Sequence, residues 1–569
     1  MRNTAYSLGM RNPNTSLGVA ALLLLATAAA TPLPAIAKGA ALARPAILFT
    51  NIVAGPTSGG PDNLGVPISI FGKGFGASQG TSTVSINGVE VARYVSWGEN
   101  NANNPLLDMI VVQPGASVRA GPIVVTVGGR VSNNDAMFAP SGGAVYFVAP
   151  TGSDSAACSQ AQPCATILHA AGDVMRPGDA LLVRGGAVND DEIWIRDVLG
   201  HSGTLASPKL ILNYPGEQPI FTKVNRPVIL EANHITFSGF RFPGGKSLGM
   251  GSESNFGNRA VNNIFEGAID FDALGSHGND HVIAGNTCDV ATSSQGTQGH
   301  CYYISAGSHL RLLYNTARGA PGYGIHIFDQ NRATNDIQRV IADVRVEGNL
   351  LAASPERSGL IIAMEDEGGR GNYIDGIVIR NNLFVANNFA GIAIGGIVRN
   401  VRIDHNTFYQ NGRQGVTIYD DARVNGITVT NNLIDQSTNS NCAANCSWYE
   451  PMHIQRGAKS LNVSASNNVY APGPALLTGI TDSAAKPGAA GFGGAPNDLH
   501  LTSASAAIDA GVAQNPAPLD FDGQLRTVGA APDAGAYEFG AGAAVPPTAT
   551  STVNPNLRKR AFVPALLKP

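Results

Sequence analysis

The sequence predicts an all-β chain in which a long solenoid of stacked parallel strands follows a small immunoglobulin-like β-sandwich. Two observations carry this prediction. Short strands that alternate apolar and polar residues fill most of the 569 residues, and an aliphatic strand ending in Asn recurs at steps of 24 to 34 residues in the second half. Because 44 % of the residues are hydrophobic, the chain is too apolar to be disordered.

The first 37 residues have the composition of an export signal. Arg2 and Arg11 precede an apolar run, "LGVAALLLLATAAA", and Ala35-Ile36-Ala37 offers a cleavage site of the small-x-small kind. A membrane anchor is the alternative, but the run is short for a span. We therefore expect residues 1–37 to be removed. The mature protein is expected to be secreted, outside a bacterial cell, in its periplasm or at its surface, with no membrane span.

Six cysteines fit an oxidising compartment. A metal site is the alternative, yet only the last two have ligand spacing, and no second half of such a site follows them. We predict three local disulfides: Cys158 with Cys164, Cys288 with Cys301, and Cys442 with Cys446.

Residues 45–140 form a block of short alternating strands separated by Gly, Asn and Pro, which is typical of a small β-sandwich. Over residues 47–138 the block resembles an IPT/TIG immunoglobulin-like module, with "IFGKGFG" as the glycine-rich turn and "GPIVVTVGG" in the late strands. This resemblance implies a spacer or a carbohydrate-binding accessory rather than a catalytic domain.

A new unit begins near residue 145. An amphipathic helix is expected from Ala165 to Met175, where Pro177-Gly178 end it, and a single helix before a long β array suits the capped end of a solenoid. Period-2 strands then end at one recurring corner: Asn286, Asn315, Asn349, Asn382, Asn406 and Asn432. Asn tolerates a left-handed backbone there, and its amide can bond to the Asn of the coil above and below.

These features together resemble the right-handed parallel β-helix of the pectin-lyase-like superfamily, over residues 145–540. The segments "DLHLTSASAAIDAG" and "DFDGQLRTVGAAPDAGAYEF" are similar to the terminal segment of secreted bacterial β-helix proteins. Residues 541–569 are rich in Pro and Thr and are expected to be disordered.

Strand alternation places candidate catalytic residues on one outer wall. In "GIHIFD" the aliphatic residues face the core, so His326 points outward, and "CYYIS" sends Tyr303 outward in the same way. We expect Asp270, from "GAIDFD", to complete a ladder with Tyr303 and His326, with His300 as a second base. Later coils should place Ile361, Ala393, Thr417 and His453 at the same position. A neutral His can accept a proton and a Tyr can donate one; the alternative is a ladder that only packs.

Acidic residues are expected to form a rim beside this ladder: Glu365, Asp366, Glu367 and Asp420. Clustered carboxylates suit Ca²⁺, which we predict as a cofactor. Alternatively, two carboxylates act as acid and base on a glycosidic bond, with Asp270 paired with Glu365 or Asp329. Solvated loop charge is the third interpretation.

No Lys occurs between Lys246 and Lys459, so a Lys base on the central coils is excluded. Several β-helix lyases use Lys or Arg as base with Ca²⁺ on the uronate. By that resemblance, Arg318, Arg332 and Arg370, together with His453, become candidate substrate-binding residues. The polygalacturonase signature is not present.

The sequence therefore predicts a polysaccharide lyase that acts by β-elimination on a uronate-containing glycan. A glycoside hydrolase, a C5-epimerase and a non-catalytic glycan-binding adhesin remain alternatives. The formal net charge is −4 and no long basic run precedes the last residues, so a nucleic-acid partner is not expected. The mature protein is expected to be monomeric.

Overall fold

The computed structural model describes residues 44–98, 101, 103–222, 228–245, 247–329, 338–436, 452–513 and 519–540. The expected export signal, the Pro/Thr-rich tail, Arg332 and the predicted Cys442–Cys446 pair lie outside the described residues. In the described part of the chain, no helix is both long and apolar enough to cross a bilayer.

Two sheets near the N-terminus form a small β-sandwich. The residues that alternate toward its interior, such as Ile70, Ile110 and Ile123, are fully buried in one apolar core. One sheet has the order β1 (Ala46–Thr50), β3 (Ile68–Lys73), β7 (Asp108–Gln113) and β6 (Arg93–Gly98). The other has the order β2 (Ala54–Pro56), β10 (Met137–Ser141), β8 (Gly121–Val127), β4 (Thr83–Ile86) and β5 (Val89–Glu90), with β9 (Arg130–Val131) beside β8.

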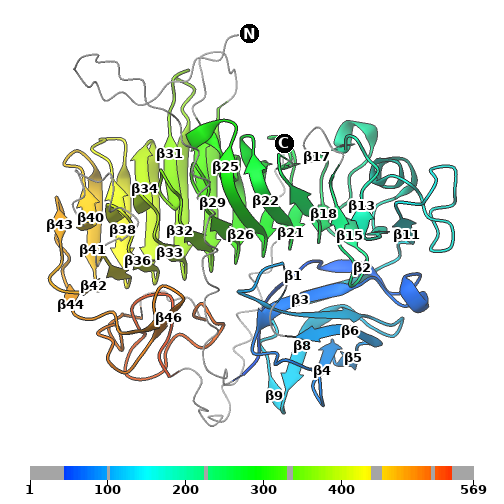
Figure 1. Ribbon diagram of the computed structural model, residues 1–569, viewed down its shortest axis with the longest axis horizontal. Helices are drawn as coiled ribbons and strands as arrows, with labels where there is room; N and C mark the ends of the chain where they lie inside the picture. Colours follow the sequence, from blue (N-terminus) through cyan, green and yellow to red (C-terminus); the bar gives the residue numbers. More distant parts are fainter. Residues whose placement is uncertain are drawn as a thin grey trace, which may run out of the picture. The chain divides into compact units, whose positions relative to one another are not determined.

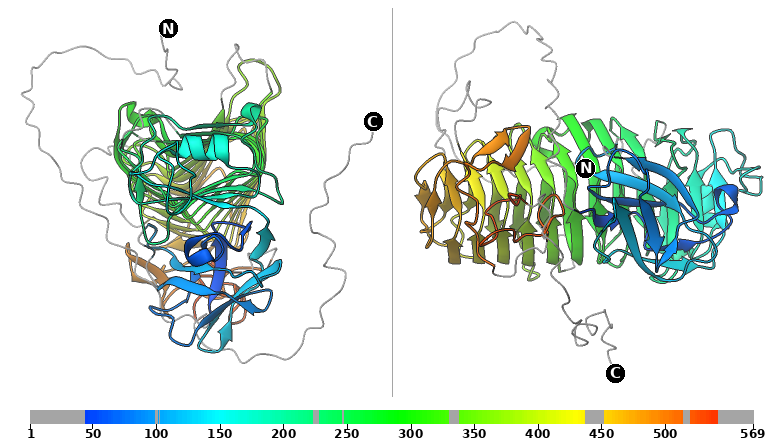
Figure 2. Two further views of the ribbon diagram at one scale, coloured as in Figure 1. Left: turned by 90° about the vertical axis from the view of Figure 1, so that its right-hand side faces the viewer. Right: turned by 90° about the horizontal axis from the view of Figure 1, so that it is seen from below.

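The solenoid confirms the predicted fold class, a right-handed parallel β-helix. Its parallel strands stack as successive rungs from β11 to β43 (Figure 1), and viewed from the end they superpose in layers (Figure 2). The strand pairings define three walls. The first wall consists of β11 (Val145–Val148), β12 (Ala180–Val183), β15 (Lys209–Asn213), β18 (Ile235–Ser238), β21 (Arg259–Val261), β24 (Val282–Ala284), β26 (His300–Leu313), β29 (Val340–Glu347), β32 (Tyr373–Arg380), β35 (Val398–Asp404), β38 (Asn425–Thr430) and β41 (Leu461–Ser466).

The second and third walls alternate with the first along the chain. The second wall consists of β14 (Trp194–Arg196), β17 (Val228–Glu231), β20 (Leu248–Met250), β23 (Asp272–His277), the first half of β26, β28 (Ile325–Asp329), β31 (Leu360–Met364), β34 (Ala390–Gly396), β37 (Gln414–Ile418), β40 (Met452–Arg456) and β43 (Leu477–Thr478). The third wall consists of β13 (Gly186–Ala187), β16 (Pro219–Ile220), β19 (Arg241–Pro243), β22 (Ile264–Ile269), β25 (Thr287–Ser293), β27 (Thr316–Arg318), β30 (Leu350–Ala352), β33 (Leu383–Val385), β36 (Thr407–Tyr409), β39 (Leu433–Asp435), β42 (Val469–Ala471) and β44 (Lys486–Pro487).

A short helical segment packs on the first coils of the solenoid. It is a single π-helical stretch, η2 (His169–Val174), and is therefore shorter than the predicted 165–175 helix. Its Ala170 and Ala171 are buried in the solenoid core. The Asp190 carboxylate accepts hydrogen bonds from the N–H groups of Ile167 and Leu168, both at 2.9 Å, and so satisfies donors that a helix start leaves free.

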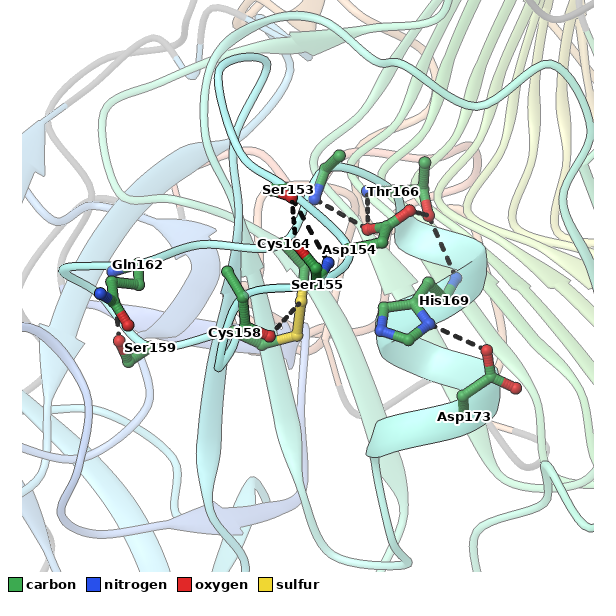
Figure 3. The surroundings of a disulfide bond; sticks show 12 residues. Ser153, Asp154, Ser155, Cys158, Ser159, Gln162, Cys164, Thr166, His169 and Asp173 are labelled. Carbon is green, nitrogen blue, oxygen red and sulfur yellow. Dashed lines mark hydrogen bonds and ion pairs between the residues drawn. A yellow bond between two sulfur atoms is a disulfide. The ribbon is translucent and has the colours of Figure 1, made fainter.

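The predicted disulfide Cys158–Cys164 closes the loop ahead of this segment (Figure 3). In the same loop, Asp154 accepts hydrogen bonds from the N–H groups of Ala165 and Thr166. The predicted Cys288–Cys301 disulfide also forms, and both of its sulfurs belong to fully buried residues. Each bridge joins parts of the chain that are close in sequence.

Buried asparagines form the ladder that the sequence predicts. Asn315 donates from both its backbone N–H and its side-chain Nδ2 to Oδ1 of Asn349, at 2.9 and 3.0 Å, and the same pair of bonds recurs from coil to coil. The ladder is longer than predicted: Asn263, Asn286, Asn315, Asn349, Asn382, Asn406, Asn432, Asn468 and finally Asp482.

One part of that prediction is wrong. The left-handed backbone at this corner belongs to the residue before each ladder asparagine, for example Tyr314 (φ 52°) and His405 (φ 53°). The ladder residue itself keeps an ordinary backbone, because its side chain must turn inward to reach the next coil.

The segment after the last coil lies against the corner between the first and third walls. Arg526 is buried there and donates to Oδ1 of Asn381, while the backbone N–H of Ala536 donates to the Thr407 hydroxyl at 2.9 Å. Asp522 of this segment pairs with Lys73 of the sandwich at 2.9 Å. The short strands β45 (Phe492–Gly494) and β46 (Asp498–Leu501) precede these contacts.

We expect Asn349→Ala to lower the free energy of unfolding by about 2–4 kcal/mol, because it leaves donors and acceptors of two neighbouring coils buried without partners. Urea denaturation measures this change. The control is Asn425→Ala, whose side chain accepts a hydrogen bond from the exposed Asn462; its loss should lower the free energy of unfolding by less than about 0.5 kcal/mol. Equal losses in the two variants would contradict a structural role for the ladder.

Candidate functional site

Tyr303 and His326 are direct neighbours on the second wall, as predicted. Tyr303 pairs with His326 in the β26–β28 register, and their ring centroids lie 5.0 Å apart. The residues on either side, Tyr302, Ile304, Ile325 and Ile327, are fully buried in the solenoid core. Both rings therefore leave the sheet on its outer side.

The register beyond His326 also follows the prediction for three coils. His326 lies opposite Ile361, Ile361 opposite Ala393, and Ala393 opposite Thr417. At the next coil Thr417 lies opposite Gln455 rather than His453.

The placement of His453 is therefore corrected. Its Nδ1 accepts a hydrogen bond from the N–H of Leu476 at 2.9 Å, and its Nε2 lies 3.0 Å from the carbonyl oxygen of Ala471. Both ring nitrogens are thus used inside the protein and the residue is buried, so His453 presents no free nitrogen on the outer face of the second wall.

The placement of Asp270 is corrected as well. Gly275 lies opposite Tyr303, whereas Asp270 lies in the corner between β22 and β23, where its carboxylate accepts a hydrogen bond from the Ser294 hydroxyl. The reason is that β22 ends at Ile269 and β23 begins at Asp272, so the chain turns the corner between two walls at Asp270 and the alternation assumed for "GAIDFD" does not continue there. Phe271, expected in the core, lies in the same corner and is 52 % exposed.

His326 lies at the centre of a group of rings that we call the aromatic cluster: His300, Tyr303, Tyr323, His326 and Phe328. The ring of His326 lies 4.2 Å from that of His300 and 4.9 Å from those of Tyr323 and Phe328. Only 8 % of His326 is exposed, so the expectation of a solvent-facing imidazole is wrong. The ring does leave the outer side of the sheet, but its neighbours cover it.

The cluster keeps its two histidines neutral. Burial lowers the pKa of His326 well below its ordinary value, and the charges of His300 and Arg357 lower it further. Burial likewise lowers the pKa of His300 to about 3, again with a contribution from Arg357. The Nδ1 of His300 accepts the backbone N–H of Tyr323 at 3.0 Å, so the neutral ring carries its proton on Nε2.

The Nδ1 of His326 is buried without a hydrogen-bond partner among the described residues. A buried polar atom without a hydrogen-bond partner lowers the stability of the folded protein. A role of this nitrogen in proton transfer would explain why a histidine occupies the position.

A carboxyl group completes the cluster, but it is Asp272 rather than Asp270. Asp272 lies opposite His300 in the β23–β26 register, and burial raises its pKa to about 8. Burial also raises the pKa of Tyr303, and the charges of Asp329 and Asp272 add to that shift. Next to the aromatic cluster, Asp272 is therefore a carboxylic acid that stays protonated at neutral pH, and Tyr303 is a phenol that does not ionise.

The positive charge that acts on the aromatic cluster belongs to Arg357, whereas the sequence predicts such a charge from Arg318, Arg332 and Arg370. Arg357 is exposed, lies between β30 and β31, and its charge acts on His300, His326, Tyr323 and Tyr419. Arg318 lies on the third wall opposite Asp289, and Arg370 lies in an exposed loop after β31.

The predicted acidic rim does not form a calcium cage. Glu365 pairs with Arg423 at 2.9 Å, Asp420 pairs with Lys459 at 3.3 Å, and Asp366 accepts the backbone N–H groups of Arg370 and Gly371. Glu367 is exposed. These carboxylates are engaged one by one and do not converge. Within the described ranges, the one group of three potential ligands close enough for an ion is Cys158, Cys164 and His169, and its cysteines form a disulfide.

No protein-family profile matches the chain, and no curated protein matches it. Many solved structures are similar to it, among them the following three. The pectate lyase Pel9A has 15 % identity and a TM-score of 0.40, over 69 % of this chain and 96 % of that one. A Family 28 exopolygalacturonase of Yersinia enterocolitica has 11 % identity and a TM-score of 0.38, over 78 % and 98 %. A GH87 α-1,3-glucanase of Streptomyces thermodiastaticus has 13 % and 0.35, over 74 % and 86 %. The fold assignment rests on the chain's own sheets, not on these weak likenesses.

We expect Asp272→Asn to stabilise the protein more as the pH rises. Asp272 ionises near 3.8 in an unfolded chain but near 8 in the folded one, so each step of pH between these values favours the unfolded wild type. The difference in free energy of unfolding between Asp272→Asn and the wild type should be smallest at about pH 4, should grow as the pH rises, and should reach a plateau near pH 8. Urea denaturation of both proteins across this window measures it, and a difference that does not change with pH would contradict the burial of this carboxyl group.

Proposed function

We propose that this protein is a carbohydrate-active enzyme, a polysaccharide lyase that cleaves a uronate-containing glycan by β-elimination. The second wall presents side chains in register at intervals of about 4.8 Å, which suits an extended polymer. The observation that carries the proposal is the in-register pair of Tyr303 and His326 beside His300 and Arg357. It joins a proton acceptor, a proton donor and a cation on one face.

The elimination assigns a role to each of these groups. The Arg357 guanidinium faces the uronate carboxylate and makes the C5 proton more acidic. The neutral imidazole of His326 takes this proton; His300 cannot, because its Nδ1 already accepts the Tyr323 N–H and its Nε2 carries a proton. The electron pair of the C5–H bond then forms the C4–C5 double bond while the bond from C4 to the glycosidic oxygen breaks. Tyr303 or the protonated Asp272 donates a proton to the leaving oxygen, so protons and electrons balance.

Export is part of the proposal. Two disulfides, Cys158–Cys164 and Cys288–Cys301, support an oxidising compartment. An acidic polysaccharide outside the cell is the substrate that fits both this location and the exposed Arg357. The IPT/TIG assignment of the sandwich and a monomeric state remain predictions.

One observation favours a second candidate, a glycoside hydrolase. Because Asp272 stays protonated to about pH 8, it suits a general acid that protonates a glycosidic oxygen. Asp329 follows the aromatic cluster on β28 and would activate water. In this mechanism the histidines only shape the site.

One assay separates the two candidates. Incubated with a panel of acidic polysaccharides, the lyase should release products that absorb ultraviolet light through the new C4–C5 double bond. We expect His326→Ala and Arg357→Gln each to reduce kcat/KM by about 100-fold or more. The matched control is Arg318→Gln on the third wall, which should leave activity nearly unchanged. Reducing ends without ultraviolet absorbance would identify the hydrolase, and full activity of His326→Ala would remove the assigned base.

Calcium at Glu365, Asp366, Glu367 and Asp420 remains a prediction from the sequence. Because Glu365 pairs with Arg423, Asp420 with Lys459 and Asp366 with backbone N–H groups, these carboxylates do not fit a calcium cage, and no step above uses the ion. We expect activity to survive EDTA. If EDTA abolished activity and added Ca²⁺ restored it, the rim would have to rearrange around the ion and the proposed chemistry would need revision.

A further inference from the structure

A cavity of about 430 Å³ lies where the sandwich meets the first wall, on a different wall from the aromatic cluster. On the sandwich side it is lined by residues of β1, among them Phe49 and Thr50. On the solenoid side it is lined by four arginines, Arg259, Arg311, Arg345 and Arg380, with Tyr314 and Glu347, and a second acid, Asp135, lines it from the sandwich. The proposed chemistry leaves this concentration of arginines unexplained.

Arg259 and Tyr314 hold the cavity open as part of the packing between sandwich and solenoid. Arg259 donates to the carbonyl oxygens of Thr50 at 2.7 Å and Asn51 at 3.2 Å. The ring of Tyr314 stacks on Phe49 at 6.1 Å, and the carbonyl oxygen of Tyr314 accepts a hydrogen bond from Asn104. The walls of the cavity are therefore built from ordered contacts on both sides.

The other three arginines, Arg311, Arg345 and Arg380, differ in how closely a carboxylate pairs with them. Arg311 pairs with Asp343 at 3.1 Å, and Arg380 pairs with Glu347 at 3.0 Å. Arg345 has one described ion pair, a long one of 3.8 Å to the same Glu347, which Arg380 already occupies. Its side chain is 44 % exposed, so its donors can be reached.

The register places two of these arginines next to each other. Arg311 and Arg345 lie directly opposite each other on β26 and β29, about 4.8 Å apart by strand spacing, and like charges placed so repel. Burial lowers the pKa of Arg345, and the charges of Arg380 and Arg311 lower it further, against the opposite effects of Glu347 and Asp343. A carboxylate between these guanidiniums would relieve the repulsion and accept paired hydrogen bonds.

We propose that this cavity is a second ligand site, separate from the aromatic cluster, in which Arg345 and Arg311 bind the carboxylate of a small acidic sugar. The volume suits one or two sugar units, and ligand sites favour junctions between domains. The choice of an acidic sugar rests on the proposed function, whereas the existence of a carboxylate site at Arg345 does not.

Calorimetric titration tests the site without any turnover. Galacturonate is titrated into the Arg357→Gln protein, in which the proposed active site is already disabled, and galactose is the neutral probe. We expect galacturonate but not galactose to bind, and Arg345→Ala to weaken this binding about tenfold or more. Arg345→Lys, which keeps the charge but loses the planar fork, should weaken it less.

The matched control is Arg399→Ala on the same wall, which pairs with Asp375 outside the cavity and should not change binding. Thermal denaturation shows whether each variant is folded. Galacturonate binding that Arg345→Ala and Arg345→Lys leave intact would overturn the proposal, as would no binding to the Arg357→Gln protein. Neither result bears on the lyase assay, which depends on the second wall.

Discussion

The buried asparagine ladder is the constraint on which the rest of the structure depends. Each ladder residue joins two coils through its backbone N–H and its amide, for example Asn349 to Asn382 and Asn382 to Asn406. Because an unpaired amide in the core costs more than an exposed one, a slip of one residue between coils would be expensive. The ladder thus fixes the register of all three walls, and this register places Tyr303 beside His326 although 23 residues separate them in the chain.

The same register creates the unusual electrostatics of the second wall. Rings stacked on adjacent rungs exclude water from one another, so burial works against every charged form within the aromatic cluster. Burial lowers the pKa values of His300 and His326 and raises that of Asp272, so all three groups are uncharged at neutral pH. The free energy spent on this desolvation yields groups that can accept and donate protons at neutral pH.

Strand periodicity predicted the fold and half of the site, and it failed where the backbone departs from the period. It placed Tyr303 and His326 correctly because β26 and β28 alternate without interruption there. It misplaced Asp270, because β22 ends at Ile269 and the second-wall strand β23 begins only at Asp272, and the alternation of "GAIDFD" does not reveal this corner. It did not select Asp272, whose burial depends on the neighbouring coil, and it missed Arg357, a loop residue whose position depends on the coil that carries it.

The strand β26 explains why the two proposed sites differ in kind. Its first half lies on the second wall with Tyr303, and its second half lies on the first wall with Arg311. The contacts of the sandwich and the C-terminal segment described above fall on the first wall and its corner with the third, at Arg259, Tyr314, Asn381 and Thr407. A polymer many sugars long needs an open row of rungs, which the first wall cannot offer beneath the sandwich. Beneath the sandwich that wall has room only for a ligand the size of its cavity, so the two proposed ligands differ in length because the two walls differ in what covers them.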